Sequence, residues 1–192
     1  MRKLFILLFS TLSISVFAQQ HPVWHSGSVV LEDGQVLAGE MVVHIDFGTL
    51  LVKSADQLIV LPPHKINFFR YYDEAENINR QFISMNVSGS KNKMFYELVV
   101  KGDYQIVRRV RHAHISKPAE IDDYSYFVLH QKNLVPIAHF KKEIFPGLVA
   151  SNPTIADWVN ENKLDVRKRE TAILVLKEYN RLSHSKHLVA LR

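Results

Sequence analysis

The feature that most constrains the fold is a series of short apolar runs separated by turn residues, which fills the first two thirds of the chain. The runs are rich in β-branched and aromatic residues, as strands are. After a first hairpin they read TLLVKS, QLIVL, KINFFRYYD, RQFISMNV, KMFYELVV, YQIVRRVRHAHI and YSYFVLH. Many short strands joined by tight turns predict an antiparallel sheet, strongly curled or folded as a sandwich or open barrel.

The first hairpin is predicted from the stretch SGSVVLEDGQVLAGEMVVHI, which spans residues 26–45. Asp33-Gly34 joins two runs rich in apolar residues, and this dipeptide is typical of a two-residue type I′ turn because it tolerates positive φ. Such a turn pairs Leu31 with Val36 and Val30 with Leu37. We therefore expect positive φ at Gly34 and a scaffolding role for the hairpin.

The last quarter changes from strand to helix periodicity, and we expect helices from about residue 139 onward. Asn152-Pro153 predicts a helix start with an Asx cap and a proline at the first helical position. A further helix from about Val166 carries one apolar stripe, typical of a helix that packs on its own sheet. The stripe consists of Ala172, Ile173, Val175, Leu176, Tyr179 and Leu182. The expected fold class is α+β, with a curled antiparallel sheet followed by two or three C-terminal α-helices.

The N-terminus has the pattern of a cleaved secretory signal. Arg2 and Lys3 precede an apolar run, and Val16-Phe17-Ala18 offers small residues at the positions that a signal peptidase reads. The expected mature chain, residues 19–192, has the length of a single domain, and we expect it to be periplasmic or secreted. The whole chain has a net charge of +5, and removal of Arg2 and Lys3 with the signal would leave only a mild positive excess. The sequence contains no cysteine, so no disulfide or thiolate site can form.

Several segments together resemble a group of secreted proteins from Bacteroidota-type Gram-negative bacteria. They read GSVVLEDGQVLAGEM, INFFRYYD, YFVLHQKNLVPIAHFKKEIFPGL, IADWVNENK and ILVLKEYN. The resemblance covers nearly the whole expected mature chain. It implies an envelope location and a β-rich fold with C-terminal helices, and it carries over no activity and no functional residue.

One candidate metal site is suggested by His112 and His114, which alternation places on the same side of a strand. Two imidazoles do not complete a zinc site, and nothing in the sequence selects a third ligand. Surface histidines on a basic strand are the simpler interpretation. We expect no bound metal and no cofactor.

The run RRVRHAH, residues 108–114, carries several cations. Alternation sends Arg109 and Arg111 to one face of the strand and Arg108 to the other. Such charges suit an edge strand, where they block unwanted pairing. The alternative is a patch formed by Arg108, Arg109 and Arg111 that contacts an anionic glycan or lipid head group. Nucleic acid is not an expected partner of an exported chain with so little excess charge.

The aromatic run NFFRYYD, within residues 67–73, is interpreted as a strand packed into the core on both faces. Its alternative role is to form one wall of an apolar ligand cavity inside a curled sheet.

Sequence signatures of enzymes are missing: there is no G-x-S-x-G, no P-loop, no G-x-G-x-x-G and no H-E-x-x-H. We therefore expect a non-enzymatic exported protein that binds another cell-envelope component or a small ligand. The alternative is an envelope hydrolase whose active site is assembled from distant residues.

Overall fold

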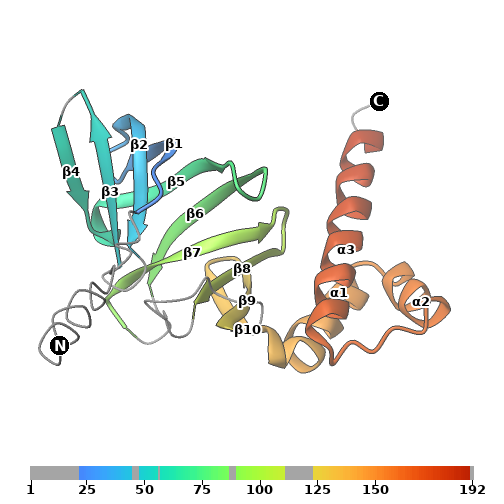
Figure 1. Cartoon of the computed structure of the whole chain (residues 1–192). Coiled ribbons are helices and arrows are strands. Elements are labelled where there is room, and N and C mark those ends of the chain that lie inside the picture. Colours follow the sequence, from blue (N-terminus) through green and yellow to red (C-terminus); the bar gives the residue numbers. More distant parts are fainter. Residues whose placement is uncertain (1–21, 45–47, 56, 87–89, 111–122, 191–192) are drawn as a thin grey trace, which may run out of the picture.

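The computed structural model describes residues 22–44, 48–55, 57–86, 90–110 and 123–190. It shows a ten-stranded antiparallel sheet followed by three C-terminal α-helices, which confirms the α+β class (Figure 1). The strands are β1 (His25–Leu31), β2 (Val36–His44), β3 (Thr49–Ser54), β4 (Gln57–Leu61), β5 (Ile66–Asp73), β6 (Ile78–Asn86), β7 (Lys93–Val100), β8 (Gln105–Val110), β9 (Tyr124–His130) and β10 (Asn133–Pro136). The predicted signal peptide lies outside the described residues.

The predicted curling of the sheet is wrong. The strand order is β10-β9-β8-β7-β6-β5-β1-β2-β3-β4, so the sheet keeps two edges and neither closes nor curls strongly. Strand β1 pairs with β2 on one side and with β5 on the other. The β1–β4 meander is therefore joined to the rest of the sheet through the β1–β5 pair. The C-terminal helices cover apolar side chains of β7, β8 and β9, so this part of the sheet is buried without closing on itself.

The first hairpin forms, but with a longer loop than predicted. Val30 pairs with Val36, and Leu31 N–H donates to the Gln35 carbonyl at 2.8 Å, which leaves a three-residue loop. Gly34 N–H donates to the Leu31 carbonyl, and Gly34 has the expected positive φ of 87°. A β-turn followed by a left-handed glycine is the usual three-residue solution. The predicted two-residue type I′ turn is therefore wrong, and the strands pair one residue away from the predicted register. The positive φ predicted for Gly34 is confirmed.

A two-residue hairpin loop with positive φ at both positions occurs instead between β9 and β10. His130 pairs with Asn133, and the loop residues Gln131 and Lys132 have φ values of 50° and 67°. A type I′ turn requires positive φ at both residues. This two-residue loop therefore has positive φ at both positions although neither residue is glycine.

The C-terminal segment begins with a 3-10 turn (Ile137–His139) and a π-helical turn (Phe140–Ile144). Three helices follow: α1 (Phe145–Ser151), α2 (Thr154–Glu161) and α3 (Arg169–Ala190). Asn152 is extended, ends α1 and accepts a hydrogen bond from the Thr154 hydroxyl at 2.9 Å. Pro153 is the N-cap residue of α2, and no side chain bonds a backbone N–H there, so the predicted Asx cap is wrong. Helix α3 begins three residues later than predicted. None of the helices in the described ranges is long and apolar enough to span a membrane.

Two apolar clusters form the core. The first belongs to β1–β6 and includes Val29, Met41, Leu50, Ile66 and Phe69. The second joins β7–β9 to the helices, and it contains the fully buried side chains of Val175 and Leu176 from α3. Amphipathic helices gain stability by burying such a stripe against a sheet. The predicted stripe therefore packs inward, and the helices lie together at the end of the sheet opposite β4 (Figure 1).

Candidate ligand site

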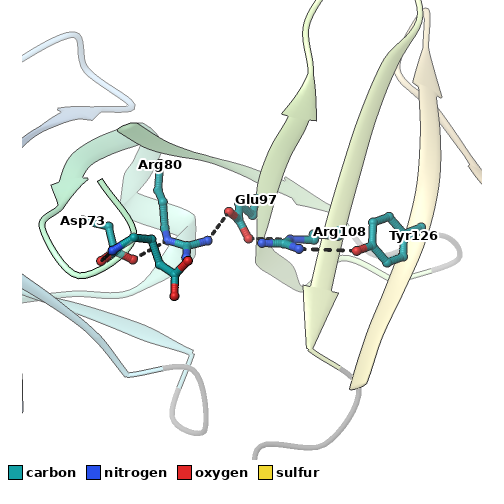
Figure 2. Close-up of polar contacts among 6 residues, drawn as sticks. Asp73, Arg80, Glu97, Arg108 and Tyr126 are labelled. Carbon is teal, nitrogen blue, oxygen red and sulfur yellow. Dashed lines mark hydrogen bonds and ion pairs between the residues drawn. The ribbon is translucent and has the colours of Figure 1, made fainter. Parts of the chain in front are cut away.

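A row of alternating charges crosses the middle of the sheet (Figure 2). Arg80 on β6 donates from Nε to Asp73 on β5 and from Nη1 to Glu97 on β7, both at 2.7 Å. The second Glu97 oxygen accepts from Arg108 Nε on β8, also at 2.7 Å. We call Asp73, Arg80, Glu97 and Arg108 the charged row. Its negative and positive charges balance, and each carboxylate accepts from at least one guanidinium.

The charged row lies on the face of the sheet that also carries both apolar clusters. Glu97 is the cross-strand partner of both Phe82 and Arg108, and Arg108 is the partner of Tyr126. Phe82 belongs to the first cluster and Tyr126 to the second. The side chains of the row are only 11–20% exposed. The row is therefore a polar boundary between two cores, where charges must be paired to offset their lost hydration.

The environment of the row shifts the ionisation of its members. Burial alone would raise the pKa of Asp73, but the hydrogen bond and charge of Arg80 and a backbone N–H from Glu76 outweigh it, so the pKa lies below its usual value. Burial also raises the pKa of Tyr71 to about 12. For Arg80, hydrogen bonds to Asp73 and Glu97 outweigh burial and raise the pKa. These shifts keep Asp73 ionised and Arg80 protonated at neutral pH.

Two tyrosines continue the row on β9, and arginines lie over both rings. The Arg108 guanidinium lies 4.1 Å from the centre of the Tyr124 ring, and its Nη1 donates to the Tyr126 hydroxyl at 3.3 Å. From the start of α3, the Arg169 guanidinium lies 5.2 Å from the centre of the Tyr126 ring. Cation–π contacts of this kind hold guanidinium groups in place over aromatic faces. Strand β9 and helix α3 thus bring arginine and tyrosine together.

A pocket of about 400 Å³ opens at this place, between β9, the segment after β10 and the start of α3. The residues around it include Tyr124, Tyr126, Arg167 and Arg169, together with Ser125, Phe127, Pro136, Ile137 and Ala138. Of these described lining residues, none is acidic. We call this concavity the tyrosine–arginine pocket.

The end of β10 explains why the pocket is open. Pro136 is the last residue of β10 and pairs with Phe127, after which the 3-10 turn Ile137–His139 follows and still contacts β9. The two-residue loop makes His130 and Asn133 a hydrogen-bonded pair, so the N–H and C=O groups of His130 point toward β10. By alternation along β9, the N–H and C=O groups of Val128, Tyr126 and Tyr124 point to the same side. The N–H and C=O groups of Tyr126 and Tyr124 therefore point to the side where β10 has already ended.

The arginines of the pocket have acidic partners. Arg167 pairs with Asp165 through two hydrogen bonds of 2.9 Å, and these bonds lower the pKa of Asp165 to about 2. Arg169 pairs with its neighbour Glu170 at 2.8 Å. The Arg167 side chain is 73% exposed and that of Glu170 is 64% exposed. Both pairs thus include at least one side chain that is more than half exposed, so they lie within reach of an external anion.

A second pocket, of about 420 Å³, lies between the β7–β8 turn and α3. Asn180 closes one side of it: its Nδ2 donates to the carbonyls of Lys101 and Tyr104, and its Oδ1 accepts from Tyr104 N–H. A Cβ on Gly102 would lie 2.3 Å from the Asn180 side chain. Asn180 thus fastens the helix to the hairpin, and we assign it a structural role.

The structure describes two of the three arginines that the sequence suggested as one patch. Arg108 and Arg109 point to opposite faces of β8, as alternation predicted, and Arg108 is already paired with Glu97. Arg109 lies against Met94, with its guanidinium 5.9 Å from the centre of the Tyr96 ring. Arg111 lies outside the described residues, so the three-arginine patch stays a prediction. The edge-strand interpretation is wrong, because β8 lies between β7 and β9.

His112 and His114 also lie outside the described residues, so their suggested metal site stays untested. Elsewhere, within the described part of the chain, no three histidine or acidic side chains gather as metal ligands. The aromatic strand β5 is buried mainly on one face: Phe69 is fully buried, whereas Tyr72 is 40% exposed. Phe69 stacks on Phe82 and packs edge-on against Phe95, so it fills the core.

Sequence reasoning missed the residues that form the pocket. The alternation in YSYF, residues 124–127, shows that Tyr124 and Tyr126 share a face. Nothing in the sequence indicates that Arg167 and Arg169 meet them, because that contact depends on how α3 returns to β9.

No protein-family model matches this chain, and neither a curated protein nor a solved structure is significantly similar to it. The resemblance to secreted proteins of Bacteroidota-type bacteria therefore stays a prediction, and the function has to be argued from the site.

Proposed function

We propose that this chain is a non-enzymatic exported protein that binds an acidic, extended segment of a cell-envelope partner in the tyrosine–arginine pocket. The observation that carries the proposal is the joint presence of Arg167 and Arg169 with Tyr124 and Tyr126 around one concavity. Export is the prediction made from the N-terminal signal pattern.

The chemistry of the pocket supports a carboxylate-bearing ligand. Guanidinium groups bind carboxylates through paired, charge-assisted hydrogen bonds, and tyrosine rings supply apolar contact area with few rotatable bonds. Arg169 is held over the Tyr126 ring, so less side-chain freedom is lost when it engages a ligand. The pocket therefore offers two cations beside Tyr124 and the largely buried Tyr126, without an acidic residue among its described lining residues.

The backbone of β9 favours a peptide over a sugar or a lipid head group. Tyr124 and Tyr126 direct N–H and C=O groups toward the side of β10, where the pairing ends at Phe127–Pro136 and no strand in the described ranges pairs with them. An extended chain can pair with these groups as a short added strand, while its acidic side chains reach Arg167 and Arg169. Anionic glycans and lipid head groups share only the second of these contacts.

The hydrolase alternative requires a nucleophile or carboxylate pair beside a base. Ser125 lines the tyrosine–arginine pocket, but the described linings of the two pockets contain no histidine. No observation on the described residues favours hydrolysis, so binding is the function that we propose.

The experiment uses a fluorescent peptide with alternating Glu and Tyr residues, and an analogue with Gln in place of Glu. We expect the protein to bind the acidic peptide at least about tenfold more tightly, and we expect higher salt to reduce this preference. The double substitution Arg167→Gln, Arg169→Gln should remove the preference. Fluorescence anisotropy measures each dissociation constant.

The matched control is Lys177→Gln, Arg181→Gln, which removes the same charge from α3 at the second pocket. This variant should bind like the wild type. Equal affinity for the Glu and Gln peptides, or equal losses in both double variants, would contradict the proposal. Binding of an acidic glycan or of anionic vesicles in place of the peptide would keep the anion site but reject the peptide partner.

A further inference from the structure

The two edges of the sheet differ in how they are protected. Strand β10 has four residues, ends in Pro136 and is contacted by the π-helical turn Phe140–Ile144. Short length, proline and cover are common ways to keep an edge from pairing. Strand β4 forms the opposite edge and has the sequence QLIVL, with no charge and no proline. The described part of the cationic run that was expected to protect an edge, residues 108–110, is on the interior strand β8.

The exposed side chains of β4 are apolar. Leu58 is 60% exposed and Val60 is 57% exposed, whereas Leu61 is buried in the first cluster. Leu58 and Val60 lie on the outer face of the sheet, opposite Lys53 and Leu51 of β3. An uncharged edge with exposed branched side chains is suited to pairing with another strand.

The register of the β3–β4 hairpin shows which backbone groups are available. Ser54 pairs with Gln57 across a two-residue loop, so this pair exchanges both hydrogen bonds. Gln57, Ile59 and Leu61 are then bonded to β3, and Leu58 and Val60 direct their N–H and C=O groups away from it. The two residues with outward backbone groups are therefore the two with exposed apolar side chains.

The strand is complementary to itself. An antiparallel pair of β4 strands centred on Ile59 places Leu58 of each copy opposite Val60 of the other. Both of these residues have outward backbone groups, so the two pairs provide four inter-chain hydrogen bonds. On the outer face, Leu58 would be followed by Val60 and Leu51 of the second copy. Within β4 itself, residues 57–61, no charged residue faces the second copy, and Lys53 of β3 pairs with Glu40 inside its own copy.

We propose that β4 pairs with β4 of a second copy of this chain, which joins two sheets across a twofold axis. The occupant is a second copy because the same five residues supply both sides of the contact with matching polarity and register. The assembly stops at two chains because β10, the other edge, is short, ends in proline and is covered. A contact of five residues on each side is smaller than a standard interface, so the dimer should be weak and depend on concentration.

Sedimentation velocity over about a hundredfold range of protein concentration tests this, using the chain without its predicted signal peptide. The wild type should shift from monomer to dimer as the concentration rises. The double variants Leu58→Lys, Val60→Lys and Leu58→Glu, Val60→Glu should each remain monomeric, because like charges would face each other across the twofold axis. An equimolar mixture of the two variants should dimerise again, since every Lys then lies opposite a Glu.

The matched control is Leu174→Lys, which adds one cation at an exposed apolar residue of α3, far from β4. It should dimerise like the wild type. Circular dichroism identifies any variant that fails to fold, and the rescue by mixing cannot occur with unfolded chains. A wild type that stays monomeric, variants that dimerise alone, or a mixture that stays monomeric would overturn the proposal. A monomer that pairs through β4 with an unrelated extended peptide would overturn it as well.

Discussion

Glu97 is the residue whose replacement tests the charged row most directly. It accepts one hydrogen bond from Arg80 and one from Arg108, both at 2.7 Å, and its side chain is only 11% exposed. In Glu97→Gln the shape is kept, but only one side-chain oxygen remains. The new amide NH₂ then faces a guanidinium, which has only donors to offer. One arginine therefore loses its carboxylate partner in a place where water has little access.

The expected loss follows from these contacts. A hydrogen bond between charged groups contributes about 1.5–3 kcal/mol, and removing one partner of a buried pair costs more than an exposed pair would. Arg80 keeps Asp73 and Arg108 keeps the Tyr126 hydroxyl, so neither cation is left alone. We expect Glu97→Gln to lower the free energy of unfolding by about 2–3 kcal/mol.

Urea denaturation at neutral pH measures this loss, with Glu40→Gln as the matched control. Glu40 pairs with Lys53 across neighbouring strands at 3.6 Å, but both side chains are more than half exposed. The control should lose about 0.5 kcal/mol or less. If Glu97→Gln loses no more than Glu40→Gln, the charged row does not stabilise the boundary between the two clusters, and our assignment of its role is refuted.

Two further predictions concern stability. Asp73 has a lowered pKa in the folded chain, so its contribution is present above its unfolded pKa of about 4 and is lost as the pH falls through the folded value. Acid denaturation of Asp73→Asn should therefore show a smaller loss below about pH 4 than the wild type, and parallel curves would contradict the assignment. Leu176→Asp should destabilise the chain by several kcal/mol, because it buries an unpaired charge in the second cluster. Leu174→Asp, at a half-exposed residue of the same helix, should cost much less in thermal unfolding, and similar losses would disprove inward packing of the stripe.

The bounds of many elements could be predicted because they depend on neighbouring residues. The runs TLLVKS, QLIVL, KMFYELVV and YSYFVLH coincide with β3, β4, β7 and β9. Alternation and turn residues act over a few positions, so one sequence contains them. The same holds for the stripe on α3, where Val175 and Leu176 are fully buried. Turn geometry was less accessible: Gly34 has the predicted φ, but the register of the strands decided how long its loop became.

The candidate site could not be predicted, because its contacts join distant parts of the chain. Arg108 was singled out as a cation for an external partner, yet its position beside β7 pairs it with Glu97. Arg169 reaches Tyr126 only because α3 packs back on β7–β9.

The order of the strands decided which of them lie at an edge of the sheet and which lie in its interior. The pairing of β1 with β5, which joins Ser28 to Arg70 across the sheet, left β4 at the open edge and put β8 in the interior. The sequence by itself determined which residues form strands and helices and which of their faces are apolar. Only the tertiary structure decided which faces meet, because that choice is made by the burial of whole surfaces against one another and not by the preferences of neighbouring residues.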